Sequence, residues 1–460
     1  MRYWPTLLMV IVLAGLGGYL YWVELPTKTR EEKQEHEEKQ LLSLPESTIS
    51  GMTVGTAQEP VELKRMGTGE WTITAPLQTA ADPREVQSLL RALVTGAVTR
   101  TIENGDASLA SFGLDPPITT ITVSSATEQE TLSIGERGPL SNTLYVFRAS
   151  DRKVLLTNLS PQDFVNKTLM TFRRKELLKF VQNDIDRVRL THPTTEIVIS
   201  NTALGEPKPF WKISYPIEAE ADQIEVRSFL FRLEDLKALA IIDPGPERDA
   251  IEKTLTAPKL KVTLYTTAGE QTVRLYQPDP QSGEAIAETT AEAPLYRVNP
   301  MTIKDLGKDL FALQDKRLLG ADTSDIAILS LQTRDQQYTL INQNGEWVLQ
   351  DRSTEKLNQD KVNLLVSRIA NLPAEERVIK QSVPLAPYGL LAPTAEFVAT
   401  GRDGKIVGKL TLGNQVGNLA YATGQRLQGI FQVRPDLLTQ IPSKTDLFDA
   451  SKDNEDNGRP

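Results

Sequence analysis

Apolar residues recur along the chain with two periods, and one combination of the two occurs three times. In each copy, a tryptophan in an alternating, strand-like stretch is followed eleven residues later by Asp or Asn and fifteen residues later by Val. Each Val opens a pattern with apolar residues at i, i+3, i+4 and i+7, the spacing of an amphipathic helix. The copies are Trp71, Asp82 and Val86; Trp211, Asp222 and Val226; and Trp347, Asn358 and Val362. This recurrence of a strand–turn–helix element indicates an internal repeat.

The polar residue before each helix predicts an N-cap. Asp82 lies three residues before Glu85, and Asp222 three residues before Glu225, which is the spacing of a capping box. The third copy has Asn358, which caps a helix but cannot act as a general base. We therefore interpret the repeated acids as caps. We interpret the repeated tryptophan as a core or sheet anchor, with a ligand-stacking platform as the alternative.

Short alternating segments between the repeated elements predict antiparallel strands. In the first unit we expect them near 118–125, 130–135, 143–148 and 152–157, and in the second near 259–265, 271–276 and 294–298. Segment 277–293 is acidic and rich in Pro, Gly and Ala, which predicts a long exposed hairpin loop. The pairs Ser160-Pro161, Asn299-Pro300 and Arg434-Pro435 each predict the start of a short helix.

A second motif, a turn, occurs in the first and third units. Phe112-Gly113-Leu114 begins 41 residues after Trp71, and Tyr388-Gly389-Leu390 begins 41 residues after Trp347. The glycines predict a positive φ or a close approach of backbone, and a functional loop is the alternative. The second unit keeps only Leu255 and Pro258 near this place.

The amino-terminal stretch predicts a membrane anchor. Residues from Trp4 to Val23 carry no charge and are nearly all apolar, with aromatic residues at both ends. A helix needs about 20 such residues to cross a bilayer. A cleaved signal peptide is the alternative, but its apolar region is usually about 7–15 residues long.

These patterns predict an α+β fold, in which an N-terminal transmembrane helix precedes three tandem α+β repeats. Each repeat is expected to have a mainly antiparallel sheet with an amphipathic helix on one face. The predicted parts are a transmembrane anchor (1–25), a charged helical stalk (26–46), three repeat units (47–183, 184–323 and 324–450) and a disordered tail (451–460). We expect the repeats on the periplasmic side of a bacterial inner membrane, although basic residues after the span favour a cytoplasmic location.

Composition removes several classes of chemistry. A net charge of −9 without a basic stripe argues against a nucleic-acid footprint. The absence of Cys excludes disulfides and thiolate sites. The two histidines, His36 and His192, have no metal-spaced partner, and no phosphate-binding loop or nucleophile elbow is present. We therefore predict no catalytic residue, no cofactor and no metal.

The motifs of the first unit, taken in the order in which they occur, resemble those of a known family. The series Trp, Asp, Val-x-x-Leu-Leu, Phe-Gly-Leu-Asp-Pro, Leu-x-Ile-Gly, Leu-Tyr-Val and Arg-Lys-Glu-Leu-Leu resembles the family of domains of unknown function numbered 4340. The third unit shares Trp347, the Tyr-Gly-Leu turn and Leu410-Thr411-Leu412-Gly413, whereas the second lacks the turn. The resemblance implies a single-pass bacterial membrane protein that accompanies an ABC-type transporter and gliding-motility-like subunits. It implies no catalytic residues.

The resulting prediction is a non-enzymatic protein with a three-module interaction or scaffold region, accessory to an ABC-type transport system. Its expected partners are the membrane and a protein of the transport complex. One alternative is a module that binds a glycan, lipid or peptide, which an aromatic-lined groove between units would favour. The other is an Asp/Glu-dependent hydrolase, which requires two carboxylates with raised pKa values converging in a cleft.

Overall fold

The computed structural model describes Met9 and residues 39–448, except 56–58, 68, 103–107, 141, 207–208, 290–293, 380–383, 435 and 437–440. Apart from Met9, the predicted anchor (1–25) lies outside the described residues, as do His36 and the predicted tail (451–460). The predicted helix start at Arg434-Pro435 also falls largely outside them.

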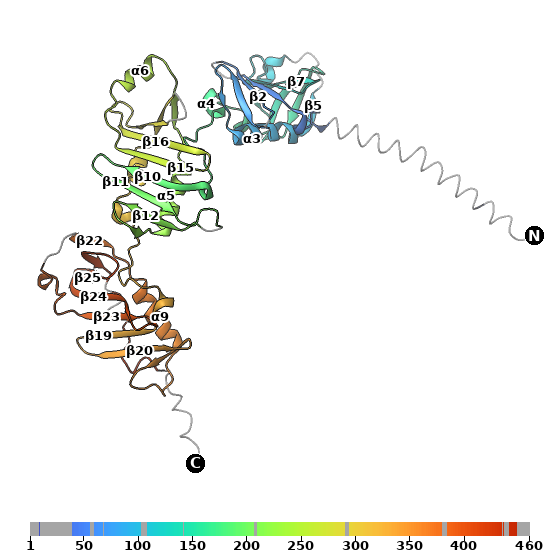
Figure 1. The fold of residues 1–460 in the computed structure, drawn as a ribbon. Helices are drawn as coiled ribbons and strands as arrows, with labels where there is room; N and C mark the ends of the chain where they lie inside the picture. The colour runs from blue at the N-terminus through green and yellow to red at the C-terminus, as the bar shows by residue number, and fades with distance from the viewer. Residues whose placement is uncertain are drawn as a thin grey trace, which may run out of the picture. The chain divides into compact units, whose positions relative to one another are not determined.

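Three mainly antiparallel sheets dominate the described chain, one in each repeat unit (Figure 1). The strand order is β4-β3-β2-β1-β6-β7-β8-β9-β5 in the first sheet and β13-β12-β11-β10-β15-β16-β17-β18-β14 in the second. The third sheet has the order β21-β20-β19-β23-β24-β25-β26-β22, which is the same topology without the short first strand. We call the three sheets with their helices the first, second and third modules.

The strands of the first module are β1 (Gly51–Val54), β2 (Val61–Arg65), β3 (Trp71–Ala75), β4 (Thr79–Ala80), β5 (Val98–Ile102), β6 (Thr119–Ser124), β7 (Gln129–Arg137), β8 (Leu144–Arg148) and β9 (Lys153–Thr157). Those of the second are β10 (Ile185–Thr191), β11 (Glu196–Asn201), β12 (Trp211–Tyr215), β13 (Ala219–Glu220), β14 (Ala240–Ile242), β15 (Leu260–Thr266), β16 (Gly269–Pro278), β17 (Ala285–Thr289) and β18 (Leu295–Val298). Those of the third are β19 (Ile328–Thr333), β20 (Gln337–Gln343), β21 (Glu346–Leu349), β22 (Glu376–Ile379), β23 (Ala395–Thr400), β24 (Ile406–Val416), β25 (Leu419–Gly424) and β26 (Ile430–Val433).

One helix of twelve or thirteen residues lies in each module: α3 (Pro83–Thr95), α5 (Gln223–Glu234) and α9 (Gln359–Ala370). The shorter α-helices are α4 (Leu169–Phe172), α6 (Pro246–Glu252), α7 (Met301–Leu306) and α8 (Leu310–Leu313). Short 3₁₀ turns include η3 (Leu109–Phe112), η4 (Pro161–Asp163) and η7 (Ala386–Tyr388). The helix predicted after Ser160-Pro161 is thus a 3₁₀ turn, and the one after Asn299-Pro300 is α7.

The predicted N-caps hold the three long helices. Asp82 accepts hydrogen bonds from the backbone N–H groups of Arg84 (2.9 Å) and Glu85 (3.5 Å). Asp222 accepts from the two corresponding N–H groups of α5, and Asn358 accepts from one N–H of α9. Glu85 does not complete the expected box; its carboxylate lies 3.5 Å from the amine of Lys167 instead.

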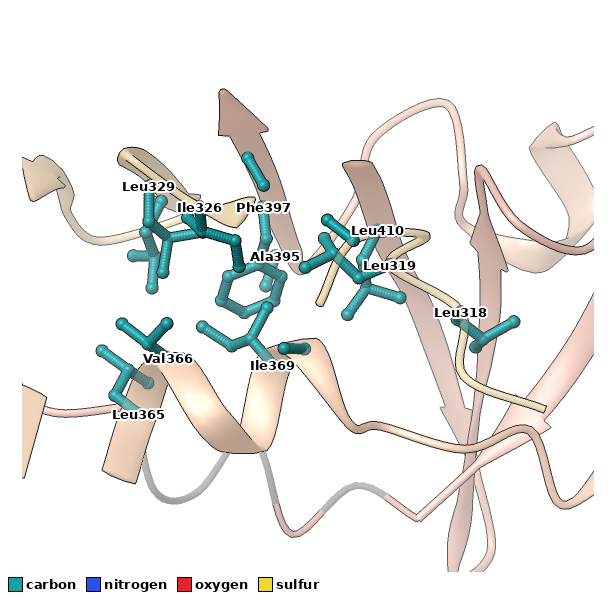
Figure 2. Close-up of a cluster of buried hydrophobic side chains, with 14 of the residues drawn as sticks. Leu318, Leu319, Ile326, Leu329, Leu365, Val366, Ile369, Ala395, Phe397 and Leu410 are labelled. Atoms are coloured by element: carbon teal, nitrogen blue, oxygen red, sulfur yellow. The ribbon is translucent and has the colours of Figure 1, made fainter. Parts of the chain in front are cut away.

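Each long helix turns its apolar stripe toward the sheet of its own module. In the third module, Leu365, Val366 and Ile369 point from α9 toward the side chains of Leu329 and Phe397 on the sheet (Figure 2). These five side chains are all at most 3% exposed. Burial of this stripe, more than helix propensity, stabilises a helix of only three turns.

The repeated tryptophans are core residues, with exposures of 6% for Trp71, 2% for Trp211 and 3% for Trp347. In the third module, Gln359 grips the backbone of Trp347: its Oε1 accepts from the N–H (2.8 Å) and its Nε2 donates to the C=O (2.9 Å). Gln223 grips Trp211 in the same way. These hydrogen bonds join the strand that contains the tryptophan to the first turn of the helix.

The structure corrects the predicted fold class. Sheets of eight or nine strands make up most of each module, and helix is the minor component. In the part of the chain that is described, no helix is both long and apolar enough to cross a membrane. The prediction of an α+β fold is therefore wrong for this structure, whereas the predicted N-terminal transmembrane helix lies, apart from Met9, outside the described residues. The helical pattern was conspicuous in sequence because it is long and regular, whereas β4 and β13 have two residues each.

The predicted loop at 277–293 is also wrong. Strand β16 continues to Pro278, and β17 occupies Ala285–Thr289 between β16 and β18. Ala285, Ile286 and Ala287 are at most 1% exposed. Only 279–284 forms the connecting turn among the described residues of this segment. Flanking strands impose the extended conformation on a sequence of low strand propensity.

A Lys-x-Leu-Leu segment within the predicted second repeat unit (184–323) is shared between neighbouring modules. Leu318 and Leu319 follow Lys316 and lie in the core of the third module, both 0% exposed. The Leu318 N–H donates to the Leu372 C=O (3.0 Å), just after α9. Leu41 makes the equivalent bond to Gly96 after α3 (3.1 Å) and lies in the first core. Residues 39–44, assigned to the stalk, therefore pack with the first module.

Candidate functional site at a module junction

The turn motif docks on a strand of its own module. Gly113 (φ +63°) and Gly389 (φ +72°) have the predicted left-handed backbone. The Phe112 carbonyl lies against Gly135 so closely that a Cβ there would collide with it, and Tyr388 lies equally close to Gly413. The ring of Tyr388 also contacts that of Tyr421, with centroids 4.9 Å apart. The motif is therefore used for packing. The glycine of the facing strand lets the backbone of the turn lie directly against that strand.

Replacing Gly135 with alanine is expected to destabilise the first module by about 1–3 kcal/mol, because the added methyl group meets backbone that cannot move aside cheaply. Gly67→Ala is the matched control, since nothing lies within 4 Å of a Cβ at that turn position. Hydrogen exchange of peptides from the first module measures both. Equal protection in the two variants would contradict the docking.

A cleft with a volume of about 710 Å³ lies where the second and third modules meet. The residues of this cleft, which we call the junction cleft, come from β13 and the residues before it, α8 and the residues after it, β22, β24 and the loop after β25. Its charged lining residues are Glu218, Glu220, Asp315, Arg377 and Arg426. Its described lining contains neither an aromatic nor a histidine side chain.

Arg426 of the third module forms ion pairs with two carboxylates of the second module. Its Nη1 donates to Glu220 (2.6 Å) and to Asp315 (2.7 Å), both of the second module. Asp315 also receives the guanidinium of Arg317, with Nη2 at 2.6 Å, and Arg317 in turn contacts Asp322. Because several charges share this partly buried network, it is more stabilising than an isolated surface pair.

Aromatic packing adds to the junction beneath the cleft. Phe311 of α8 stacks with Phe431 of β26, with ring centroids 6.0 Å apart. The guanidinium of Arg377 lies over both rings, at 5.1 Å and 5.4 Å from their centroids. Burial lowers the pKa of Arg377, against the opposing charge of Asp309. The junction thus combines ion pairs, cation–π contacts and apolar packing.

Asp315 does not have the properties of a catalytic proton donor. Burial raises the pKa of Asp315, but hydrogen bonds from Arg317 and the charges of Arg426 and Arg317 outweigh it, so the pKa lies below its ordinary value. A carboxylate that stays ionised and neutralised by arginine does not serve as a proton donor near neutral pH. This geometry does not favour the hydrolase alternative.

The other candidate groups are also engaged. His192 lies with Nε2 3.1 Å from the carbonyl of Lys308. No cluster of three metal-ligating side chains occurs among the residues with described positions. Since Trp71, Trp211 and Trp347 are buried, none of them forms the aromatic platform that would favour a glycan-binding groove.

A comparison with known families finds one family three times along the chain. The sequence profile of the domain of unknown function DUF4340 matches residues 71–258, 211–356 and 347–451. The chain belongs to the DUF4340 family. This confirms the resemblance and its three copies. Each DUF4340 match begins at, or spans, one of the buried tryptophans. No match was found among curated proteins, so no activity is carried over to this DUF4340 chain from a relative.

Replacing Arg426 of this DUF4340 chain with alanine is expected to weaken the junction by about 1–2 kcal/mol, a modest loss because the Glu220 carboxylate is partly solvated. Spin labels at Ala268→Cys and Arg402→Cys report it, since the chain has no other cysteine. Their distance distribution should broaden in the variant. Arg434→Ala, which removes only the Arg434–Glu375 pair within the third module, is the control and should leave it narrow.

Low pH should also weaken the junction between the second and third modules. The lowered pKa of Asp315 means that its contribution to stability is complete above the ordinary carboxylate pKa of about 3.9. The contribution is lost as the pH falls through the lower, folded-state value. The spin-label distribution should therefore stay narrow at pH 6 and broaden only below about pH 4. Broadening that begins near pH 6 would point to a different group.

Proposed function

We propose that this chain is a non-enzymatic scaffold that binds a protein partner across its modules. The observation that supports the proposal most is the set of ion pairs and aromatic contacts between the second and third modules. A fixed junction keeps the surfaces of two modules in register, which lowers the entropic cost of engaging one partner with both. The motif residues of the repeats are used for packing, which leaves recognition to the surfaces.

The partner we propose is a subunit of an ABC-type transport system, the association that the family resemblance implies. Binding of a glycan, lipid or peptide is the weaker alternative, because the junction cleft lacks aromatic lining and the tryptophans are buried. An extracytoplasmic location stays a prediction, which a compartment-specific reporter fused after Pro460 tests.

Crosslinking in cells followed by purification of the tagged full-length chain tests the scaffold. We expect transport subunits to be enriched at least tenfold over a purification with an unrelated protein carrying the same tag. The Arg426→Ala variant should reduce that enrichment, whereas Arg434→Ala should not. Recovery of the chain alone would overturn the proposal.

A further inference from the structure

Arg377 lines the junction cleft, is half-buried and has no ion-pair partner among the described residues. The rings of Phe311 and Phe431 attract its guanidinium but do not neutralise its charge. Of its five N–H donors, one makes a described hydrogen bond, from Nη2 to Gln314 Oε1 at 3.4 Å. Asp309 is close enough to act on the charge but not to form an ion pair, and it caps α8 instead. The unused donors of Arg377 therefore suit a carboxylate from outside the chain.

The sister modules show that the fold does not require this arginine. Thirty residues after the repeated tryptophan, the third module has Arg377, whereas the first has Thr101 and the second has Ile241. These residues belong to β22, β5 and β14, which occupy the same place at the edge of their sheets. The strand forms with an uncharged residue in two of the three copies. The arginine is therefore a feature of the cleft and not of the repeat.

The acids of the cleft do not supply the missing partner. Glu220 and Asp315 are both paired with Arg426. Glu218 is exposed and has neither an ion-pair nor a hydrogen-bond partner in the described part of the chain. One cation, Arg377, and one anion, Glu218, therefore remain unpaired in the described lining, and they do not pair with each other. A ligand that complements this cleft carries both a carboxylate and a cationic group.

The rest of the lining suits a peptide backbone. Gln425 and Gln428 are exposed, and their side-chain amides have no hydrogen-bond partner among the described residues. A side-chain amide both donates and accepts, as a peptide group does. Ile217, Leu310 and Val407 add apolar surface to the lining. The volume of about 710 Å³ falls within the range of roughly 300–1,000 Å³ that is typical of ligand sites, so the cleft has room for a segment of a few residues.

We propose that the junction cleft binds a short segment of the protein partner that carries a carboxylate and, a few residues away, a basic side chain. The inference rests on the scaffold function proposed above and names the contact that the partner makes. The carboxylate belongs to a chain terminus or to an Asp or Glu side chain, and it accepts N–H groups that the planar guanidinium of Arg377 offers side by side. The basic side chain pairs with Glu218 and sets the direction of the segment. Because Glu218 belongs to the second module and Arg377 to the third, the bound segment bridges the junction.

Defined peptides test the chemistry on the full-length chain. The probes are acetylated peptides of three to five residues, with Lys first, Leu last and Ala between, and with a free carboxyl terminus. One twin of each has an amidated terminus, and a second, amidated twin has Glu before the Leu. Calorimetry measures their binding. We expect the free-acid peptide, the Glu peptide or both to bind at least tenfold more tightly than the neutral amide, which also identifies the source of the carboxylate. Equal binding of all three forms, or binding of none, would refute the proposal.

Variants of the chain locate the site. Arg377→Gln should weaken binding of the carboxylate peptides at least tenfold, whereas Arg334→Gln, at an exposed arginine of the third module outside the cleft, should leave it unchanged. Glu218→Lys should weaken binding of the Lys peptide and strengthen binding of a free-acid peptide that has Glu in place of Lys. The comparison of free acid with amide uses the natural chain and does not depend on the folding of any variant. Unchanged binding by Arg377→Gln would place the peptide elsewhere and exclude the cleft.

Co-purification from cells separates the failure of this inference from that of the scaffold function. In the crosslinking experiment described above, Arg377→Gln should reduce the enrichment of transport subunits at least threefold, and Arg334→Gln should not. If the subunits are enriched equally with Arg377→Gln, the cleft is not their contact and only this inference fails. If the natural chain recovers no subunit, the scaffold function fails and this inference fails with it.

Discussion

Replacing Trp347 with alanine is expected to lower the free energy of unfolding of the third module by about 3–5 kcal/mol. The side chain is 3% exposed within the core. Its indole N–H also donates to Asn363 of α9 (3.1 Å), so the substitution leaves a cavity and removes this hydrogen bond. Because each module has its own core, the first module should keep its stability.

Hydrogen exchange with mass spectrometry separates the modules in this test. Peptides from α9 should lose protection in Trp347→Ala, while peptides from α3 should not change. Leu364→Ala, on the exposed face of α9, is the matched control and should change stability by less than about 0.5 kcal/mol. Loss of protection in α3 to the same extent would mean that the modules unfold together and that the cores are not independent.

Leu319→Ala is expected to destabilise the third module by about 2–5 kcal/mol, although the residue follows the last elements of the second. Its side chain is 0% exposed in the third core, and its carbonyl accepts from Lys409 of β24 (3.0 Å). The absence of a side chain at Gly408 allows this close approach, since a Cβ there would lie 2.6 Å from the Leu319 carbonyl oxygen.

The measurement for Leu319 compares hydrogen exchange in β24 with that in β16. Protection should fall in β24 and persist in β16. Leu391→Ala, a substitution of a leucine that is 70% exposed in the same module, should alter neither. A loss confined to β16 would assign Leu319 to the second core and overturn the shared-segment interpretation.

The helices and their anchors were predictable from sequence because their signals are local. The cap at Asp82, the apolar stripe that begins at Val86 and the fixed distance from Trp71 lie within one short stretch. Strand β17 was missed for the opposite reason: Ala285–Thr289 has little strand propensity of its own and is held by its neighbours. The fold class was wrong because short strands leave weaker patterns than helices.

The candidate site could not be predicted at all. Arg426 lies 206 residues from Glu220 and 111 residues from Asp315, and no local period relates them. The exposed apolar residues Ile224 and Phe231 of α5, by contrast, could be identified from the sequence. Aligning the three helices by their tryptophans shows Ile224 and Phe231 beside polar residues of the sister copies. The signal is the departure of these two positions from the repeat.

The shared Lys-x-Leu-Leu segment also bears on how such a chain grows or shrinks during evolution. A duplication that starts at residue 324 would copy the third sheet without Leu318 and Leu319, and the new copy would have a hole in its core. One that starts at Lys316 would carry both leucines and the backbone pairing to Leu372 with it. Recombination between Lys-x-Leu-Leu segments would therefore yield complete modules. The stretch of sequence that is copied would begin a few residues before the sheet whose core it completes.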